Sequence, residues 1–242
     1  MRKYPSKSGP FDEALYFDQE EIDEVCESVL KSVDLYPDTP EPVRIERFLE
    51  KKFGISPEYD VLPEGVLGFT KFGPDGPERV VLSSLLTEGG SRFSERRIAT
   101  TIAHEAGHIL FHSDLFRRLF KKPPMKRLFL DFDAGVDEKR TVLCRDIPES
   151  PENRRSSYDG SWWEHQANKA IGALLMPYGL LEKTVAPFFE TKKTPNAFFE
   201  VPRLAPEKRE AAVRHLSETF DVNPVVAKIR LEEIYPASKF SR

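Results

Sequence analysis

The chain has 242 residues, of which 39% are hydrophobic and 11% aromatic, and its formal net charge is −4. This composition is that of a globular protein, and the near balance of charges excludes bulk attraction to nucleic acid or an anionic membrane. No apolar run approaches the ~20 residues of a membrane span, and residues 1–21 lack the apolar core of a signal peptide. We therefore expect a cytoplasmic protein without membrane contact. Two cysteines, Cys26 and Cys144, are too few for a disulfide framework.

The first part of the chain is expected to be helical. Apolar residues at helical spacing predict one helix from Gln19 to Val33 and a second from Val43 to Phe53, which ends at Gly54. The second helix should bury three apolar side chains, namely Ile45, Phe48 and Leu49.

A β-hairpin and a helix that carries a histidine motif are expected next. Two strand-like stretches, 65–72 and 79–86, flank the turn sequence GPDGP. Ser94 is a candidate N-cap for the following helix. Apolar residues form a stripe along that helix, which predicts that one side of the helix is buried. The stripe consists of Ile98, Ile102, Ala106, Ile109 and Leu110.

The pattern weakens from 113 to 160, where we expect a solvated insertion; its position next to the motif leaves a substrate-recognition loop as the alternative. Helical character returns over 162–177, and a proline-rich linker follows. Residues 206–236 are expected to form two helices. Asn223 is the predicted N-cap of the second, with Pro224 at its first helical position.

Three histidines stand four residues apart in the sequence TTIAHEAGHILFH, residues 100–112. On a helix, His104 and His108 project from one face about a turn apart, which suits two nitrogen ligands of a tetrahedral Zn²⁺. Glu105 completes an H-E-x-x-H motif, in which the metal lowers the pKa of a water and the glutamate takes its proton. The alternative is that the repeat is the polar seam of an ordinary buried helix.

His112 is a weaker candidate for a ligand. It lies eight residues beyond His104, or roughly 12 Å along a straight helix, so one ion cannot bind both unless the chain bends. Metzincins bend here at a glycine and bind a third ligand just beyond, but this chain has Phe111 and Asp114 at those places. We therefore expect His112 to lie behind the ligands or to serve the structure of the helix.

A third ligand is expected from the sequence WEHQAN. Glu164 and Asn168 are four residues apart, so both can face the first helix, and Glu164 would complete a His₂Glu site. Asn168 could then accept a hydrogen bond from the free ring N–H of a ligand histidine. On spacing alone, an exposed helix charge is the favoured interpretation of Glu164.

Two segments resemble the ImmA/IrrE family of metallopeptidases: RFSERRIATTIAHEAGHILFH and WEHQANKAIGALLMP. The second follows the family signature E-x-x-A-N-x-x-A-A-x-L-L-M-P, except that Ile171 and Gly172 replace two alanines. The resemblance covers roughly residues 40–112 and 160–235. It implies an α+β, zincin-like fold, zinc bound by His104, His108 and Glu164, and Glu105 as the catalytic residue.

We therefore expect a zincin-like metallopeptidase domain over residues 1–200, with the insertion at 113–160, and a helix-turn-helix-like tail over 201–242. The expected activity is that of a zinc-dependent endopeptidase, with Mn²⁺ as an alternative metal. The free edge of the hairpin could hold an extended substrate. The resemblance implies that this substrate is a helix-turn-helix repressor, whose cleavage would relieve repression in a mobile element or a stress response.

The alternative function is a non-enzymatic regulator that binds DNA or a repressor, or a toxin–antitoxin component, with a structural metal site. The tail could make weak DNA contact, although its charges are nearly balanced. Cys144 is expected to be a buried thiol, the alternative being an inhibitory thiolate on the zinc.

Overall fold

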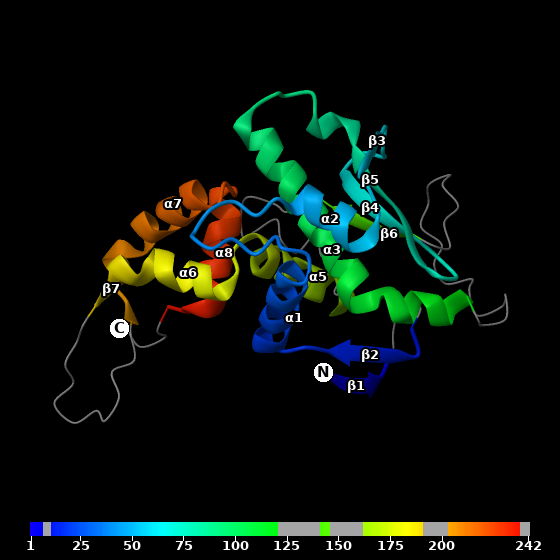
Figure 1. The fold of residues 1–242 in the computed structure, drawn as a ribbon, viewed down its shortest axis with the longest axis horizontal. Helices are drawn as coiled ribbons and strands as arrows, with labels where there is room; N and C mark the ends of the chain where they lie inside the picture. The colour runs from blue at the N-terminus through cyan, green and yellow to red at the C-terminus, as the bar shows by residue number, and fades with distance from the viewer. Residues whose placement is uncertain (7–10, 121–140, 146–161, 191–202, 238–242) are drawn as a thin grey trace.

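The computed structural model describes residues 1–6, 11–120, 141–145, 162–190 and 203–237, with the backbone alone for 141–145 and 203. The architecture is mixed α and β (Figure 1). The long helix α3 (Arg92–Phe120) is central: one side of it contacts a four-stranded sheet and another side packs on α5 (Trp162–Leu175). Among the described helices, none combines the length and apolar character needed to cross a bilayer.

The N-terminal residues form a two-stranded antiparallel hairpin that the sequence analysis did not predict, with β1 at Arg2–Pro5 and β2 at Glu13–Tyr16. The predicted first helix is confirmed as α1 (Gln19–Lys31), two residues shorter at its end. It begins at a capping box, in which the side chain of Asp18 accepts from the backbone N–H of Glu21 and the Glu21 side chain accepts from that of Asp18.

The predicted second helix is confirmed as α2 (Ile45–Phe53), which starts two residues later than expected. It ends at Gly54, whose left-handed φ of 68° is a conformation that glycine adopts without steric cost. The three predicted side chains are buried, namely Ile45, Phe48 and Leu49.

The predicted hairpin is confirmed as β4 (Val66–Gly73) and β5 (Gly76–Ser83), but its turn is shorter than expected. Gly73 pairs with Gly76, so only two residues lie in the turn and the second strand begins and ends earlier. Residues Ser84–Leu86 form a 3-10 helix (η1) instead of continuing the strand.

Both edges of this hairpin are paired, so the expectation of a free hairpin edge was wrong. The sheet order is β3-β5-β4-β6, in which β3 (Glu58–Asp60) runs parallel to β5 and β6 (Thr141–Arg145) runs antiparallel to β4. Within the described part of the chain, the open edges of the sheet belong to β3 and β6.

Helix α3 is longer at both ends than predicted. The N-cap assigned to Ser94 was wrong, because Ser91 Oγ accepts from the backbone N–H of Ser94 and the helix starts at Arg92. At the other end the helix continues eight residues past His112, where Phe116 stacks on Phe72 of β4 with ring centroids 4.2 Å apart. Residues 113–120 are therefore not a solvated insertion; most of the remainder of that segment lies outside the described residues.

The helix predicted over 162–177 is α5, and the linker expected after it starts instead with α6 (Tyr178–Val185). Pro177 stands at the N-cap of α6, a place where proline's missing N–H breaks no helical bond. Short elements then lead to the tail. They are two 3-10 helices, η4 (Ala186–Phe188) and η5 (Pro206–Lys208), and a pair of strands, β7 (Phe189–Glu190) and β8 (Arg203–Leu204).

The tail forms the two predicted helices, α7 (Arg209–Thr219) and α8 (Pro224–Ile234), with Asn223 at the N-cap of α8. Helix α8 packs on α5 and turns Arg230 inward. The Arg230 guanidinium donates to Asp23 Oδ1 (2.6 Å) of α1 and to the carbonyl of Met176 (3.3 Å). A Cβ on Gly172 would lie 2.6 Å from Cδ of Arg230, so the Arg230 side chain would have to shift to admit any other residue at this position.

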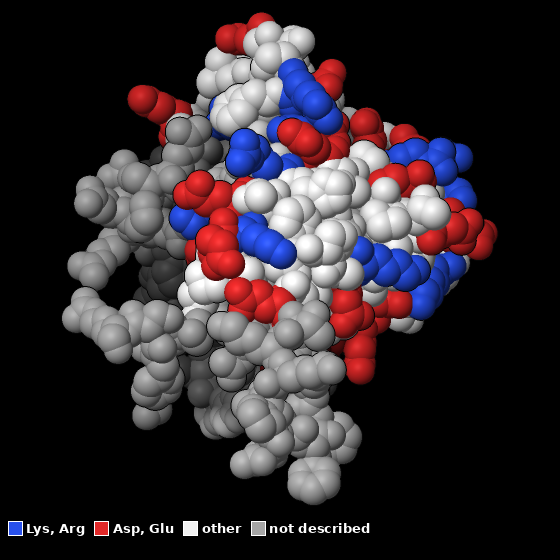
Figure 2. All heavy atoms as spheres, turned by 90° about the vertical axis from the view of Figure 1, so that its left-hand side faces the viewer, with Lys and Arg blue, Asp and Glu red and all other residues white. Residues whose placement is uncertain are grey.

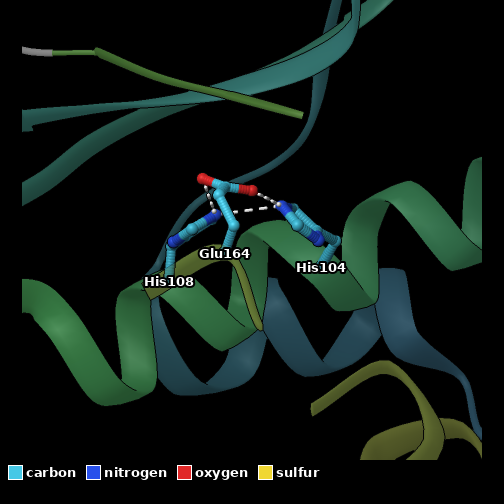
Figure 3. A group of neighbouring side chains, drawn as sticks. All are labelled: His104, His108 and Glu164. Atoms are coloured by element: carbon cyan, nitrogen blue, oxygen red, sulfur yellow. Dashed lines mark hydrogen bonds and ion pairs between the residues drawn. The ribbon is translucent and has the colours of Figure 1, made fainter. Parts of the chain in front are cut away.

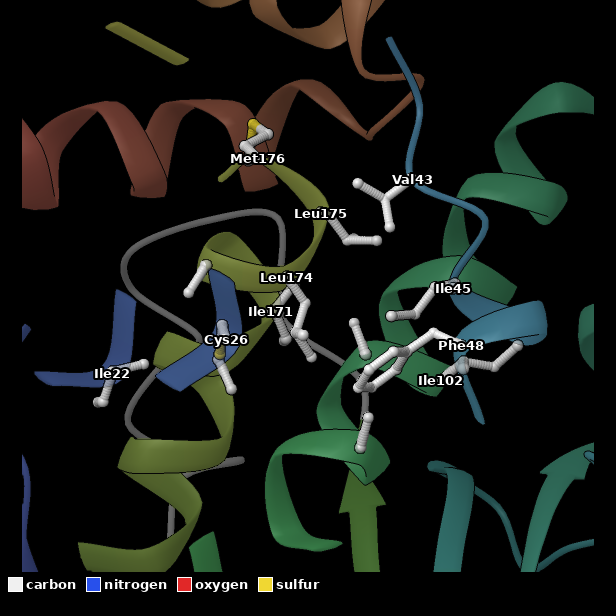
Figure 4. Close-up of a cluster of buried hydrophobic side chains, with 14 of the residues drawn as sticks. Ile22, Cys26, Val43, Ile45, Phe48, Ile102, Ile171, Leu174, Leu175 and Met176 are labelled. Atoms are coloured by element: carbon white, nitrogen blue, oxygen red, sulfur yellow. The ribbon is translucent and has the colours of Figure 1, made fainter. Parts of the chain in front are cut away.

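Buried apolar side chains from α1, α2, α3 and α5 form one continuous core (Figure 4). Cys26 of α1 is part of it, and burial raises the pKa of its thiol. The side chain of Cys144, in β6, lies outside the described part of the structure, so its predicted burial stays a prediction.

Candidate metal centre

The candidate site depends on a close approach between α3 and α5. A Cβ on Gly107 would lie 2.8 Å from Cβ of Ala170 and 3.1 Å from Cα of Ala167. Because only hydrogen fits at Gly107, the two helix backbones come near enough for a short carboxylate side chain on α5 to reach the histidines on α3.

His104, His108 and Glu164 converge on one point (Figure 3). Glu164 Oε2 lies 3.3 Å from His104 Nε2, and Glu164 Oε1 lies 3.3 Å from His108 Nε2. The two Nε2 atoms are 2.9 Å apart. One ligand atom from each side chain falls within 4.8 Å of the others, and both histidines are buried. The structure thus brings the three predicted ligands together.

The other ring nitrogens of the two histidines already have partners. His104 Nδ1 lies 3.1 Å from Asn168 Oδ1, the contact expected of Asn168. His108 Nδ1 lies 3.2 Å from Nδ1 of His112. The helix is continuous through this region, so His112 lies behind His108 and is not among the three converging side chains. His165, beside Glu164 in sequence, is exposed.

Glu105 is completely buried and interacts electrostatically with His104 and Glu164. Thr70 Oγ1 of β4 donates to Glu105 Oε2 at 2.6 Å, while Glu105 Oε1 has no hydrogen-bond partner among the described residues. Burial raises the pKa of Glu105 to about 7, against the opposing effects of His104 and Thr70. An unpartnered buried carboxylate oxygen is costly, so Glu105 Oε1 calls for a partner such as a water molecule or an ion.

The protonation of the cluster fits a cation. Burial lowers the pKa of His108, which favours the neutral imidazole that a metal needs. Burial alone would raise the pKa of Glu164, but the adjacent His108 and His104 outweigh it and hold that pKa below its usual range. Two imidazole nitrogens and one carboxylate match the donor set of a catalytic zinc site.

Two further residues of the site were missed by the sequence analysis. Thr70 is on a strand and comes near Glu105 only through the packing of β4 on α3. Gln166 is buried on α5, and its Oε1 lies 3.0 Å from His112 Nε2. Thr70 belongs to no local motif, and Gln166 occupies an unspecified position of the segment WEHQAN, so no signal in the sequence identified either residue.

Comparisons with known proteins do not assign a family. No family model matches the chain, and no match is found among curated proteins. Among solved structures, the chain is similar to a Mycobacterium tuberculosis transcriptional regulator, with 16% sequence identity and a TM-score of 0.46. The alignment covers 88% of this chain and 46% of that one, so this chain spans less than half the length of that protein.

Proposed function

We propose that the chain is a zinc-dependent endopeptidase of the zincin type, in which His104, His108 and Glu164 hold the metal and Glu105 is the catalytic base. The observation that carries the proposal is the convergence of the three ligand atoms beside the buried Glu105, one oxygen of which has no partner among the described residues. A structural zinc site has four protein ligands and no use for such a carboxylate, whereas hydrolysis needs an open ligand position and a base.

A bound Zn²⁺ would polarise the scissile carbonyl and lower the pKa of a water molecule. Glu105 carries out the proton transfers. Its Oε1 takes a proton from the water molecule while the water oxygen attacks the carbonyl carbon. Glu105 then passes the proton to the amide nitrogen as the C–N bond breaks. Thr70 holds the other oxygen, so Oε1 is the atom free to act. A pKa of about 7 suits a base that works at neutral pH.

Zinc is favoured over manganese by the ligands. Imidazole nitrogen suits zinc, whereas Mn²⁺ prefers sites made of carboxylates, carbonyls and water. Two of the three ligand atoms here are nitrogens, from His104 and His108.

A helix-turn-helix repressor remains the proposed substrate, on the strength of the family resemblance. An extended segment of it could add to the sheet at β6, which pairs with β4 alongside Thr70 and so runs past Glu105. This replaces the hairpin edge as the expected place of binding.

The charges on the surface of the tail do not favour a DNA-binding protein. Acidic and basic side chains are interspersed on the face of the molecule where α6 and α7 lie (Figure 2). The exposed charges of η5, α7 and α8 are mixed in the same way: Glu207, Lys208, Glu210, Arg214, Glu218, Lys228 and Glu232. DNA binding needs a basic face.

The test is incubation of the purified protein with the helix-turn-helix repressor encoded by the neighbouring gene. We expect a single cut that a chelator abolishes and added Zn²⁺ restores. Glu105→Gln, which removes the base and no ligand, should retain zinc and lose activity by at least about 100-fold. An intact repressor under zinc-loaded conditions, with the repressor bound but uncut, would favour the non-enzymatic regulator.

A further inference from the structure

A chain of buried polar groups runs from His108 away from the candidate metal centre. His108 Nδ1 lies 3.2 Å from His112 Nδ1, and His112 Nε2 lies 3.0 Å from Gln166 Oε1. Gln166 Nε2 in turn donates to the backbone carbonyl of Leu15 in β2. His108, His112 and Gln166 are all buried. This series of hydrogen bonds therefore connects His108, a proposed metal ligand on α3, to the N-terminal hairpin.

The donor and acceptor of each hydrogen bond in this series can be assigned by starting from the Leu15 carbonyl at its end. The Leu15 carbonyl can only accept, so the Gln166 amide must point its NH₂ group toward Leu15 and its oxygen toward His112. That oxygen also only accepts, so His112 carries a proton on Nε2. Burial disfavours a charged imidazole between a neutral amide and another imidazole, so His112 Nδ1 is then an acceptor.

The same logic determines the proton position on His108. An acceptor at His112 Nδ1 requires a proton on His108 Nδ1, which leaves the lone pair of His108 Nε2 directed at Glu164. His104 reaches the same state by a different route, since its Nδ1 faces the oxygen of Asn168. Asn168 is exposed, whereas the partners of His108 are buried and end on a backbone carbonyl.

We propose that Gln166 is a positioning residue of the metal centre: held by the backbone of β2, it determines through His112 which nitrogen of His108 carries the proton. The inference rests on the metal site of the proposed function. The opposite arrangement, with a proton on His108 Nε2, would block the nitrogen that faces Glu164. Through Gln166, zinc affinity thereby depends on the packing of the N-terminal hairpin, whose Leu15 carbonyl accepts from the Gln166 amide.

The experiment is a double-mutant cycle on zinc affinity, measured by competition with a chromophoric chelator. Gln166→Leu removes both amide contacts, and His112→Phe keeps a ring against Trp162 but removes the acceptor for His108. Each should weaken zinc binding by about 10–100-fold. The double variant should be no weaker than His112→Phe alone, because without His112 the amide has no route to His108.

A second readout is the ¹⁵N NMR spectrum of the histidine rings in the zinc-loaded protein. Wild type should show His108 protonated on Nδ1 and His112 protonated on Nε2, and Gln166→Leu should reduce the Nε2-protonated form of His112. The control is Thr184→Val, which removes the buried hydrogen bond of Thr184 to the Leu180 carbonyl, remote from the site in sequence. It should lower thermal stability with zinc affinity unchanged. If Gln166→Leu fails to fold, Gln166→Asn, which is too short to span both partners, replaces it.

Two results overturn the inference while leaving the metal site standing. One is a Gln166→Leu protein that binds zinc as wild type does; the other is a full additional loss of affinity in the His112→Phe background, which would mean that Gln166 acts by placing α5. A wild-type protein that binds no zinc overturns the metal site and this inference together.

Discussion

Thr70 of β4 donates a hydrogen bond of 2.6 Å to Glu105 of α3, and both side chains are completely buried. This contact joins the sheet to the helix at the candidate base, 35 residues away in sequence. Thr70 thus fixes one oxygen of Glu105 and, by hydrogen bonding to the ionised carboxylate, acts to lower its pKa.

Thr70→Val should therefore shift the acid limb of the pH–rate profile to higher pH. Loss of the hydrogen bond raises the pKa of Glu105, so less of the base is ionised below pH 7. A hydrogen bond to a charged group contributes roughly 1.5–3 kcal/mol, which corresponds to an activity loss of about 10- to 150-fold at pH 6. Thr70→Ser, which keeps the hydroxyl, should restore the wild-type profile. An unchanged profile in Thr70→Val would show that the contact does not act on the base.

Gly107→Ala should separate α3 from α5. The added Cβ would meet Ala170 at 2.8 Å and the backbone of Ala167 at 3.1 Å, and overpacking of this kind typically costs about 1–3 kcal/mol. Because Glu164 reaches the histidines only across this contact, zinc affinity should fall at least about tenfold.

The control for Gly107 is Gly54→Ala. Gly54 has no atom within 4 Å of an added Cβ, but its φ of 68° makes alanine strained by roughly 1–2 kcal/mol. Both substitutions should lower the Tm, whereas only Gly107→Ala should weaken zinc binding in the titration. Equal zinc affinities for the two variants would mean that the helix spacing does not determine the site.

Glu233 of α8 should make stability depend on pH. Burial raises the pKa of its carboxyl to about 7, with Arg230 and Lys169 opposing and Asp23 adding to the effect. The folded state therefore holds this proton to higher pH than the unfolded state, whose value is near 4.5. The contribution of the protonated Glu233 to the free energy of unfolding is fully present below about pH 4.5 and is lost as the pH rises toward 7.

Glu233→Gln, which is neutral at every pH, should thus have a higher Tm than wild type at pH 8 and a similar Tm at pH 4.5. Glu232→Gln makes the same substitution at an exposed neighbouring position and is the control. A Tm difference that is constant from pH 4.5 to pH 8 would exclude a titrating Glu233.

The parts of the fold that follow from local pattern were predicted well. His104 and His108 face one way because helix geometry alone places residues four apart on one face, and the burial of Phe48 and Leu49 follows from the same periodicity. Glu164 was identified by resemblance as well as by spacing, because it comes from another helix 56 residues beyond His108.

The missed elements depend on tertiary contacts. Thr70 and Gln166 gain their roles only when β4, α5 and the N-terminal hairpin pack around α3. The prolines that follow the helix predicted over 162–177 suggested a linker, yet the chain continues as α6 with Pro177 at its N-cap, because an N-terminal proline is compatible with a helix. The extension of α3 past His112 is stabilised by Phe116 stacking on Phe72, a contact with no signature in the sequence.

The most direct test of the metal centre is competitive zinc titration of Glu164→Gln beside His165→Gln and Asn168→Ala. Glu164→Gln keeps the side-chain size and removes the charge that balances Zn²⁺, so zinc affinity should fall by more than the roughly 10–100-fold expected for Asn168→Ala. His165→Gln, an exposed neighbour on the same helix, should bind zinc as wild type does. A Glu164→Gln protein with wild-type zinc affinity would contradict the assignment of His104, His108 and Glu164 as the metal ligands.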